Sequence, residues 1–508
     1  MIKLITSFFL TGITSFVLAQ TYQPPYFADN NRIEKIKATQ AIIDKIFKDH
    51  AATHHFPGFV YGIVVDGELV YTGNTGYTDI KKKIAATTSS AFRIASMSKS
   101  FTAMAIVKLR DEGKLKLDDA ASLYIPEMKD LKYLTSDAPD ITIRHLLTHA
   151  AGFPEDNPWG DRQLAVTDQV LMDHIKNASF SNVPGIDYEY SNLGFALLGK
   201  IITNVSGKPY QQYITETILH PVGMYNTFWE YSQVTAEKLA HGYRWINNTW
   251  QEETLLHDGA YGAMGGIITT IEDFNKYMAL HLSAWPASSE EENPVIKRSS
   301  LREMQAAHNF SGLNPNFKYA SGRTCATTSA YAYGLRWSTD CEDKTFVGHT
   351  GGLPGFGSNW NILPDYGIGV VSFANVTYAP TAFINQSVLD SIVKLAGLTK
   401  RNIPPSTILE KRKNELLKYL RNWSLAKTSG IFAENFFLDY AVENLQKESV
   451  SLFLKAGHII RVHELQPENN LRGSFLLEGE NANLLVRFTL TPEKFPLIQE
   501  YRIREIAK

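Results

Sequence analysis

The chain has 508 residues, of which 44% are hydrophobic and 20% are charged, and this composition is typical of soluble globular proteins. Its length exceeds that of one ordinary domain, so we expect a large core with an appended domain. The formal net charge of −2 argues against nucleic acid or an acidic membrane surface as a bulk partner.

The first 19 residues have the organisation of a secretory signal peptide. Lys3 supplies a positive start, residues 4–16 form an apolar stretch diluted by Thr and Ser, and Val17-Leu18-Ala19 matches a cleavage site. We therefore predict cleavage after Ala19 and export, either to the periplasm or out of the cell. No later stretch reaches the roughly 20 apolar residues of a membrane span, so no transmembrane segment is expected after signal removal.

The next part of the chain alternates between helical and strand patterns. Apolar residues recur at helical spacing over residues 30–50. Residues 58–78 alternate as a strand pair, and Asp66-Gly67 suits the positive φ values of a tight hairpin turn. Residues 115–224 are expected to be mostly helical, with breaks at Gly and Pro.

Residues 262–398 are expected to form loops first and then strands. Residues 262–266 and 286–324 are rich in glycine or polar residues, and we expect the second segment to be a mobile surface insertion. Strand patterns and a final helix follow, with strands over residues 331–337, 345–350, 358–363 and 367–375 and the helix over residues 380–398.

This order predicts an α+β fold for residues 20–400, in which helices flank an antiparallel β-sheet and a helical subdomain is inserted. Residues 401–429 contain a Pro-rich break and a charged helix, which we interpret as a linker helix. Residues 430–508 are expected to form a separate, small, all-β domain. Its strands are predicted over residues 436–442, 449–454, 458–463, 474–477 and 484–490.

The chain has two cysteines, Cys325 and Cys341. In an exported protein an even pair favours a disulfide, and the predicted strand between them makes hairpin-like proximity plausible. The alternative is two free thiols. Neither cysteine has the His or Asn signature of a catalytic thiol.

Ser96 and Lys99 carry the first chemical signal, because they lie three residues apart where a helix-periodic apolar run begins. Residues at this spacing share a helix face, so the amine can reach the hydroxyl. The N–H groups of a first helical turn also favour developing negative charge. The same Ser-x-x-Lys spacing recurs at Ser391 and Ser424, so the motif alone is a weak signal.

Tyr190-Ser191-Asn192 is a second candidate, placed before a helical run. A tyrosine hydroxyl beside a nucleophile can relay a proton, and an asparagine amide can hold a substrate carbonyl. The structural alternative is a core tyrosine with an asparagine that caps a helix.

His349-Thr350-Gly351-Gly352 is the third candidate, at the end of a predicted strand. Glycines at a strand edge let a substrate approach the backbone and expose N–H donors to an oxyanion. The alternative is a tight glycine turn.

His145 and His149 are spaced as in a helical zinc site, but the Glu of His-Glu-x-x-His is absent and no third ligand is evident. A structural role is the expected one.

Together, Ser96-Met97-Ser98-Lys99, Tyr190-Ser191-Asn192 and His349-Thr350-Gly351 stand in the order of the three motifs of the serine β-lactamase/penicillin-binding protein superfamily. The chain most resembles the class C β-lactamase-related branch, which includes D-alanyl-D-alanine carboxypeptidases, esterases and D-amino-acid amidases. The resemblance covers about residues 32–397 and implies the β-lactamase/transpeptidase-like fold.

The resemblance also implies roles for these residues. Ser96 would be acylated by the substrate, and Lys99 and Tyr190 would share the general-base task. Asn192 would hydrogen-bond the acyl chain, and the backbone N–H groups of Ser96 and Gly352 would form the oxyanion hole. Water would then hydrolyse the acyl-enzyme, and no metal or organic cofactor is needed.

His349 departs from the dedicated β-lactamases of this branch, which carry Lys at that position. Lys is a fixed cation that can hold a substrate carboxylate, whereas imidazole is only partly charged near neutral pH. The departure argues against strong β-lactam turnover.

We therefore expect an exported serine hydrolase that cleaves an ester or amide in a small-molecule or peptide substrate. A D-alanyl-D-alanine carboxypeptidase, penicillin-binding protein or weak β-lactamase is the alternative within catalysis. A non-catalytic scaffold on the same fold is the alternative of another class.

Overall fold

The computed structural model describes residues 22–319 and 321–508, and the chain divides into two compact units. The large unit comprises Asp29–Lys400, and the small unit comprises Arg401–Lys508 with the described residues up to Ala28. The predicted signal peptide, residues 1–19, lies outside the described residues. In the part of the chain that the structure describes, no helix combines the length and hydrophobicity needed to cross a lipid bilayer.

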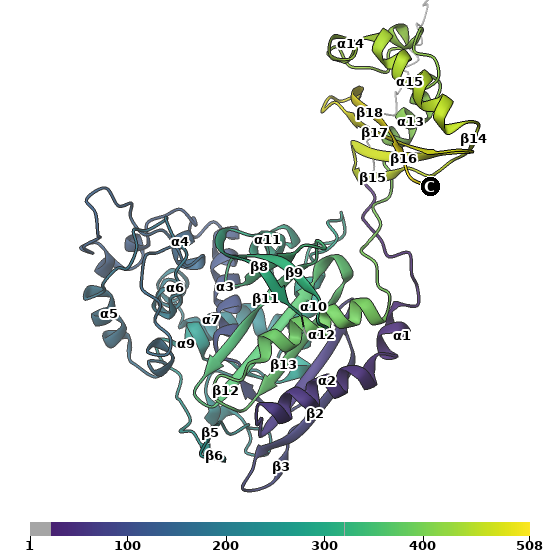
Figure 1. Ribbon diagram of the computed structural model, residues 1–508. Helices are drawn as coiled ribbons and strands as arrows, with labels where there is room; N and C mark the ends of the chain where they lie inside the picture. The colour runs from purple at the N-terminus through teal and green to yellow at the C-terminus, as the bar shows by residue number, and fades with distance from the viewer. Residues whose placement is uncertain (1–21, 320) are drawn as a thin grey trace, which may run out of the picture. The chain divides into compact units, whose positions relative to one another are not determined.

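The large unit is built on a nine-stranded sheet in which all neighbouring strands are antiparallel (Figure 1). Its strands, in spatial order, are β3 (Ile84–Ala85), β2 (Glu68–Asp79), β1 (Gly58–Val65), β13 (Ile368–Ala374), β12 (Phe356–Leu363), β11 (Thr345–Leu353), β10 (Arg336–Asp340), β9 (Thr324–Tyr331) and β8 (Asn309–Lys318). The early β1–β2 hairpin therefore pairs with the late strand β13. The predicted hairpin is confirmed, with positive φ values of 50° at Asp66 and 88° at Gly67.

Helices cover both faces of the sheet. On one face, α2 (Gln40–Thr53) and α12 (Thr381–Leu395) pack side by side, and Phe47 and Ile392 are buried in one apolar cluster with the sheet (Figure 1). On the other face, Phe101 of α3 (Ser98–Asp111) and Phe274 of α10 (Ile271–Leu282) are buried in a second cluster. Strands β1 and β13 are buried along their whole length, because both of their faces are covered.

The remaining elements of the large unit are mostly the inserted helical region. They are α1 (Arg32–Lys37), β4 (Phe92–Arg93), α4 (Ile143–Leu147), α5 (Asp168–Lys176), α6 (Asn192–Ser206), α7 (Tyr210–Ile214), α8 (His220–Val222), β5 (Tyr243–Ile246), β6 (Thr249–Glu252), α9 (Gly262–Gly265), β7 (Ile268–Thr269) and α11 (Arg298–Met304). The α+β class, with an antiparallel sheet flanked by helices, is confirmed.

Three local predictions are wrong. The glycine-rich segment 262–266 contains the buried helix α9 rather than a loop. Segment 286–324 is not a loop throughout, because it contains α11 and β8. The residues of β8 are largely exposed, and the strand shows no apolar alternation. The single strand predicted over 331–337 is two strands, separated by a turn with Gly334 at φ 65°.

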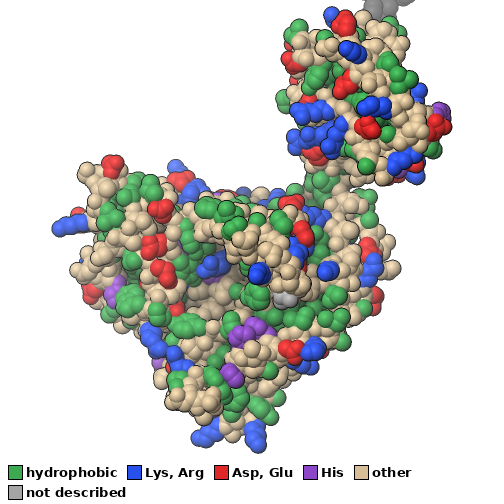
Figure 2. Space-filling model, viewed as in Figure 1, with side chains coloured by type: hydrophobic (Ala, Val, Ile, Leu, Met, Phe, Trp, Pro, Cys, Tyr) green, Lys and Arg blue, Asp and Glu red, His purple; other side chains and the backbone are tan. Residues whose placement is uncertain are grey.

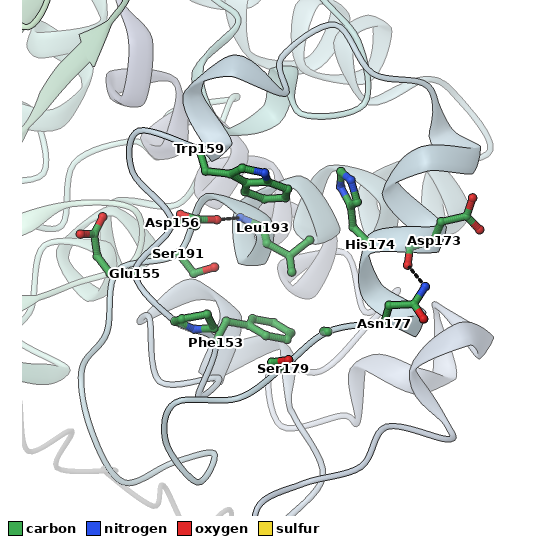
Figure 3. A pocket seen from close by; sticks show the side chains of 12 residues that line it. Phe153, Glu155, Asp156, Trp159, Asp173, His174, Asn177, Ser179, Ser191 and Leu193 are labelled. Atoms are coloured by element: carbon green, nitrogen blue, oxygen red, sulfur yellow. Dashed lines mark hydrogen bonds between the residues drawn. The ribbon is translucent and has the colours of Figure 1, made fainter.

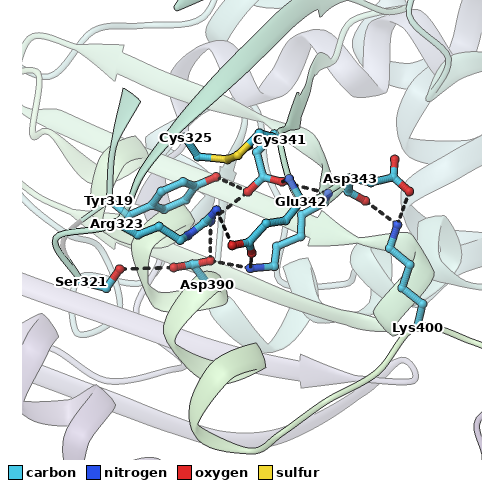
Figure 4. Close-up of polar contacts among 11 residues, drawn as sticks. Tyr319, Ser321, Arg323, Cys325, Cys341, Glu342, Asp343, Asp390 and Lys400 are labelled. Carbon is cyan, nitrogen blue, oxygen red and sulfur yellow. Dashed lines mark hydrogen bonds and ion pairs between the residues drawn. A yellow bond between two sulfur atoms is a disulfide. The ribbon is translucent and has the colours of Figure 1, made fainter. Parts of the chain in front are cut away.

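Cys325 and Cys341 form the predicted disulfide, which joins β9 to the residue after β10 (Figure 4). Beside it, Asp390 of α12 accepts from Arg323 at 2.7 Å and from Lys344 at 2.8 Å. Asp340, Glu342 and Asp390 are the one group in the described residues whose spacing could suit a metal ion, but Arg323 and Lys344 already pair with these carboxylates. The cluster is therefore an ion-pair network that anchors the β9–β10 hairpin to α12.

The small unit contains a five-stranded antiparallel sheet in which β16 and β17 are central, β14 and β15 both pair with β16, and β18 is an edge strand paired with β17. Its elements are α13 (Thr407–Leu416), α14 (Phe436–Asp439), α15 (Val442–Ala456), β14 (Ile459–Val462), β15 (Gln466–Asn469), β16 (Arg472–Gly479), β17 (Asn483–Leu490) and β18 (Ile498–Ile506).

Two features of the small unit differ from the sequence predictions. The strands predicted over 436–442 and 449–454 are α14 and α15, because apolar residues such as Leu445 and Ala456 face the core at helical rather than alternating spacing. The segment interpreted as a linker helix, 401–429, places Leu409 and Trp423 in the buried core and is part of the unit. Tyr26 and Asn402 exchange backbone hydrogen bonds of 3.0 and 2.7 Å within this unit.

Replacing Cys325 and Cys341 together by Ala should lower the free energy of unfolding of the large unit by about 3 kcal/mol. The disulfide closes a loop with a sequence separation of 16 residues, and opening it enlarges the unfolded ensemble. Urea unfolding followed by circular dichroism measures the change. A reducing agent should bring the wild type to the level of the variant and leave the variant unaffected. Equal unfolding midpoints for the two proteins would contradict the prediction.

Candidate active site

Ser96 lies in a short 3-10 turn, Ala95–Met97, that leads directly into α3. The preceding residue, Ala95, is fully buried and has a positive φ of 51°, a conformation that costs a non-glycine residue on the order of 1–3 kcal/mol. The bend turns Ser96 toward the helical region while its backbone stays against the sheet. Figure 2 shows the surface of the large unit hollowed between the helical region and the sheet.

Lys99 reaches Ser96 as the spacing predicts, with Nζ donating to Oγ at 2.9 Å. The ammonium also donates to Oδ1 of Asn192 at 2.7 Å and to the backbone carbonyl of Met264 at 2.9 Å. These three bonds use all three donors of a charged lysine. Met264 was missed by sequence reasoning, because a backbone acceptor leaves no residue-type signal.

Burial lowers the pKa of Lys99 to about 7, and Arg336 acts in the same direction, while Asp161 and Asp156 act against it. The side chain is fully buried, so water does not stabilise its charged form. A lysine with this pKa is neutral in a large fraction of molecules at physiological pH, and its lone pair can then accept a proton.

Tyr190 is also brought to the nucleophile and hydrogen-bonds with Ser96. Burial raises the pKa of its phenol, so the hydroxyl stays protonated and can donate. The ring lies 4.9 Å from the ammonium of Lys99 and 5.4 Å from the guanidinium of Arg336. Two basic side chains therefore lie within cation–π distance of the Tyr190 ring.

Asn192 is held by both ends of its amide. Its Oδ1 accepts from Lys99, and its Nδ2 donates to Oδ1 of Asn157 at 2.6 Å. Asp156 accepts from the backbone N–H groups of Asn192 and Leu193 at 2.7 and 2.8 Å, which satisfies two N–H groups at the start of α6. The residue that caps α6 is Ser191, whose hydroxyl accepts from Gly194 N–H, and not Asn192 as the structural alternative had it.

A cavity of about 500 Å³ lies behind this segment, with Asp156, Ser191 and Leu193 in its wall (Figure 3). Phe153 and Trp159 line opposite sides of it in the close-up. The loop 153–159 therefore has two faces, one holding Asn192 and one lining this cavity.

His349 is 1% exposed, and its two ring nitrogens have partners. Nδ1 lies 2.6 Å from the carbonyl of Thr350, so this nitrogen carries the proton and donates. Nε2 lies 2.8 Å from the hydroxyl of Tyr331 and accepts from it. Burial lowers the pKa of His349 well below its usual value, so the ring is neutral and cannot act as a fixed cation for a substrate.

Gly351 and Gly352 allow the close packing of β11. A Cβ at Gly351 would lie 2.1 Å from the carbonyl of Ile94, so only glycine lets β11 approach the segment that carries Ser96. A Cβ at Gly352 would lie 2.9 Å from the ring of Tyr378. Thr350 is half-buried and accepts from Asn359 at 3.2 Å.

His145 and His149, the pair spaced as in a helical zinc site, have structural roles. Nδ1 of His149 accepts from the backbone N–H of Ser191 at 3.1 Å, and His145 forms a capping box with Thr142 at the start of α4. His149 thereby fixes the backbone next to Tyr190 and Asn192.

Arg336, at the start of β10, was missed by sequence reasoning. Its side chain is surrounded by protein on most sides yet remains solvent-accessible, as expected for a group that lines a cleft. It lines a polar cavity of about 190 Å³ with His349 and Thr350. Tyr188, Tyr190 and Tyr331 favour its charged form, and no ion pair between Arg336 and a carboxylate occurs among the described residues.

Comparisons with known proteins agree with this architecture. The sequence model of the Beta-lactamase family matches residues 43–391. "Protein flp" of Staphylococcus aureus is 31% identical over 349 residues, which are 67% of this chain and 64% of that protein. "Beta-lactamase-like protein 2" of Dictyostelium discoideum is 31% identical over 268 residues, covering 51% of this chain and 47% of that protein.

Among solved structures, the octameric penicillin-binding protein homologue from Pyrococcus abyssi has a TM-score of 0.59 at 20% identity. The similarity covers 91% of this chain and 99% of that one. The fold is therefore that of the serine β-lactamases and penicillin-binding proteins.

The chain belongs to the beta-lactamase family, whose sequence model covers most of the large unit. Its match spans about 64% of the length of the Staphylococcus aureus relative.

Replacing His349 by Asn should flatten the pH dependence of stability. The unfolded histidine takes up a proton below about pH 6.5, whereas the buried ring does not, so stability falls as the pH falls. Between pH 6 and 5 the free energy of unfolding should fall less steeply in the variant, by about 1.4 kcal/mol per pH unit. Urea unfolding of both proteins at these pH values measures how the free energy of unfolding changes with pH. Equal changes in the two proteins would contradict the prediction.

Proposed function

We propose that this chain is an exported serine hydrolase that cleaves an ester or amide through an acyl-Ser96 intermediate. The observation that carries the proposal is the 2.9 Å contact between Lys99 Nζ and Ser96 Oγ, together with a lysine pKa lowered to about 7 by burial. Membership of the beta-lactamase family supports the same chemistry.

In the proposed reaction, neutral Lys99 accepts the Ser96 proton as Oγ attacks the substrate carbonyl carbon. The backbone N–H groups of Ser96 and Gly352 donate to the resulting oxyanion. Tyr190 gives its proton to the leaving group as the carbon–heteroatom bond breaks, and it recovers a proton through the Ser96–Lys99 contact. A water molecule then attacks the acyl carbon by the reverse sequence and releases the acid.

A D-alanyl-D-alanine carboxypeptidase is the second candidate, and Arg336 is the observation that favours it. A solvent-accessible guanidinium beside Thr350 suits a substrate that ends in a carboxylate. Neutral His349 cannot supply that charge, so Arg336 would have to supply it.

Export is supported by the Cys325–Cys341 disulfide, since structural disulfides persist mainly in oxidising compartments. The signal-like residues 1–19 agree with it. The periplasm and the extracellular space are both compatible with these features.

A fluorophosphonate should add one adduct to the wild type and none to Ser96→Ala, as measured by intact mass. The labelling rate should rise with pH to half its maximum near pH 7, because only neutral Lys99 accepts the proton and its pKa is about 7. A lasting benzylpenicillin adduct on Ser96 would favour the carboxypeptidase. An unlabelled, folded wild type would instead favour a non-catalytic scaffold.

Replacing Arg336 by Gln should separate the two candidate functions. If Arg336 holds a substrate carboxylate, kcat/KM for peptides with a free C-terminus should fall roughly 10- to 100-fold, the loss expected for a hydrogen bond to a charged group. Amide-capped peptides and neutral esters should lose much less, and only through the rise in the Lys99 pKa that follows the loss of Arg336. Arg461→Gln, an exposed arginine of the small unit, is the matched control. An equal loss on free and capped peptides would refute carboxylate recognition.

A further inference from the structure

Asp161 is a buried carboxylate close to the candidate active site, and none of the roles above uses it. It lies in a 3-10 turn, Gly160–Arg162, and is 2% exposed. One oxygen, Oδ2, accepts from the hydroxyl of Tyr378 at 3.1 Å. The other oxygen, Oδ1, is buried without a hydrogen-bond partner among the described residues. A buried carboxylate left half satisfied is costly, so its retention calls for an electrostatic reason.

The hydrogen bond from Tyr378 to Asp161 joins the two walls of the site. On one wall, a Cβ at Gly160 would lie 2.9 Å from Cβ of Asn192, so the turn packs directly against the residue that binds Lys99. On the other wall, the ring of Tyr378 lies 2.9 Å from the Cβ position of Gly352 on β11. The bond therefore connects the Asn192 side of the cleft to the glycine strand.

Three charged groups face Lys99 from different elements. Asp161 and Asp156 favour its ammonium form, and Arg336 of β10 opposes it. The negative charge of Asp156 is spread over two backbone N–H donors of α6, at 2.7 and 2.8 Å. Among the described residues, Asp161 accepts a hydrogen bond only from the Tyr378 hydroxyl, and its charge has the larger of the two carboxylate effects on the pKa of Lys99.

Asp161 is itself influenced by its surroundings. Burial raises the pKa of its carboxyl to about 6, with Asp156 and Glu155 acting in the same direction and Lys99 and Tyr378 acting against it. The carboxylate is therefore ionised over the pH range in which Lys99 loses its proton. Both charges titrate in one buried cluster, so removing one must move the other.

We propose that Asp161 is a positioning residue for the Ser96–Lys99 pair, and that its buried negative charge, held in place by Tyr378, sets the basicity of Lys99. This inference rests on the proposed function. With Asp161 ionised, Lys99 holds its proton more firmly and is a stronger base for the Ser96 hydroxyl once deprotonated. In the described part of the chain the hydrogen-bond partner of Asp161 is Tyr378 rather than Ser96, so Asp161 acts through Lys99.

Two near-isosteric substitutions separate the charge from the hydrogen bond. Asp161→Asn removes the charge and keeps an oxygen that can accept from Tyr378. Tyr378→Phe removes the hydrogen bond and keeps the charge. The pH at half-maximal fluorophosphonate labelling should fall by about one unit in Asp161→Asn, the usual effect of losing a nearby opposite charge. It should fall less in Tyr378→Phe, where the charge remains but the loss of the hydrogen bond raises the pKa of Asp161. The maximal labelling rate of Asp161→Asn should also fall, because the base is weaker.

The ionisation of Lys99 can also be followed directly, without activity. Protein carrying ¹³Cε-lysine is titrated by NMR, and the Lys99 signal is identified by its loss in Lys99→Arg. Its midpoint should fall in Asp161→Asn and fall less in Tyr378→Phe, which weakens the charge of Asp161 without removing it. A wild type that does not react with the fluorophosphonate would count against the proposed function alone. The NMR titration would still test the effect of Asp161 on the pKa of Lys99.

An unchanged Lys99 midpoint in folded Asp161→Asn overturns the inference, as does an equal shift in both variants. Circular dichroism reports folding, and Asp161→Ala serves if the Asn variant does not fold. If neither neutral variant folds, Asp161→Glu decides, because it retains the charge and should keep a midpoint close to that of the wild type. A midpoint about one pH unit below that of the wild type would then refute the inference.

Discussion

The architecture of the site depends on the burial of a single amino group. Lys99 is sealed from water, so its ammonium needs three acceptors from the protein, and they come from three distant parts of the chain: Ser96, Asn192 and the carbonyl of Met264. The turn before α3, the start of α6 and the short helix α9 must all be correctly placed for this to occur. An error in any of them would leave a buried charge unsatisfied, and such a charge is among the most expensive defects in a protein interior. The helical region and the sheet are thereby coupled through one side chain.

The site also requires close contact between backbone segments, and glycine allows it. Gly351 lets β11 lie against the Ile94 carbonyl, and the strained φ of Ala95 then turns Ser96 out of the packed interface. The carboxylates and the guanidinium around the site adjust the electrostatics of a geometry that these contacts have already set. Charge and shape are thus supplied by different residues.

The sequence predicted those parts of the fold whose signal is local. Alternation and Asp66-Gly67 indicated the first hairpin, and helical spacing indicated α12, because both patterns reflect burial on one face. The edge strand β8 was missed, since it is mostly exposed and has no apolar alternation, and α15 was taken for a strand from a short apolar run. At the site, motif order brought out Ser96, Lys99, Tyr190, Asn192 and the glycine strand. Met264 acts through its backbone carbonyl, and Asp161 acts through a single buried charge. Arg336 reaches the site only after folding. None of these features leaves a spacing pattern in the sequence.

Tyr26 and Asn402 pair through their backbones, so the chain enters and leaves the 29–400 segment at nearly the same point. In topological terms, the large unit is a long excursion of the chain from the small unit. Backbone hydrogen bonds join the segments through which the chain enters and leaves this excursion. Such an arrangement is insensitive to the length of the excursion, because closing a longer loop costs only slightly more entropy. It also means that the large unit has adjacent ends, which is the condition under which a domain can be transplanted into another protein or circularly permuted without disturbing its interior.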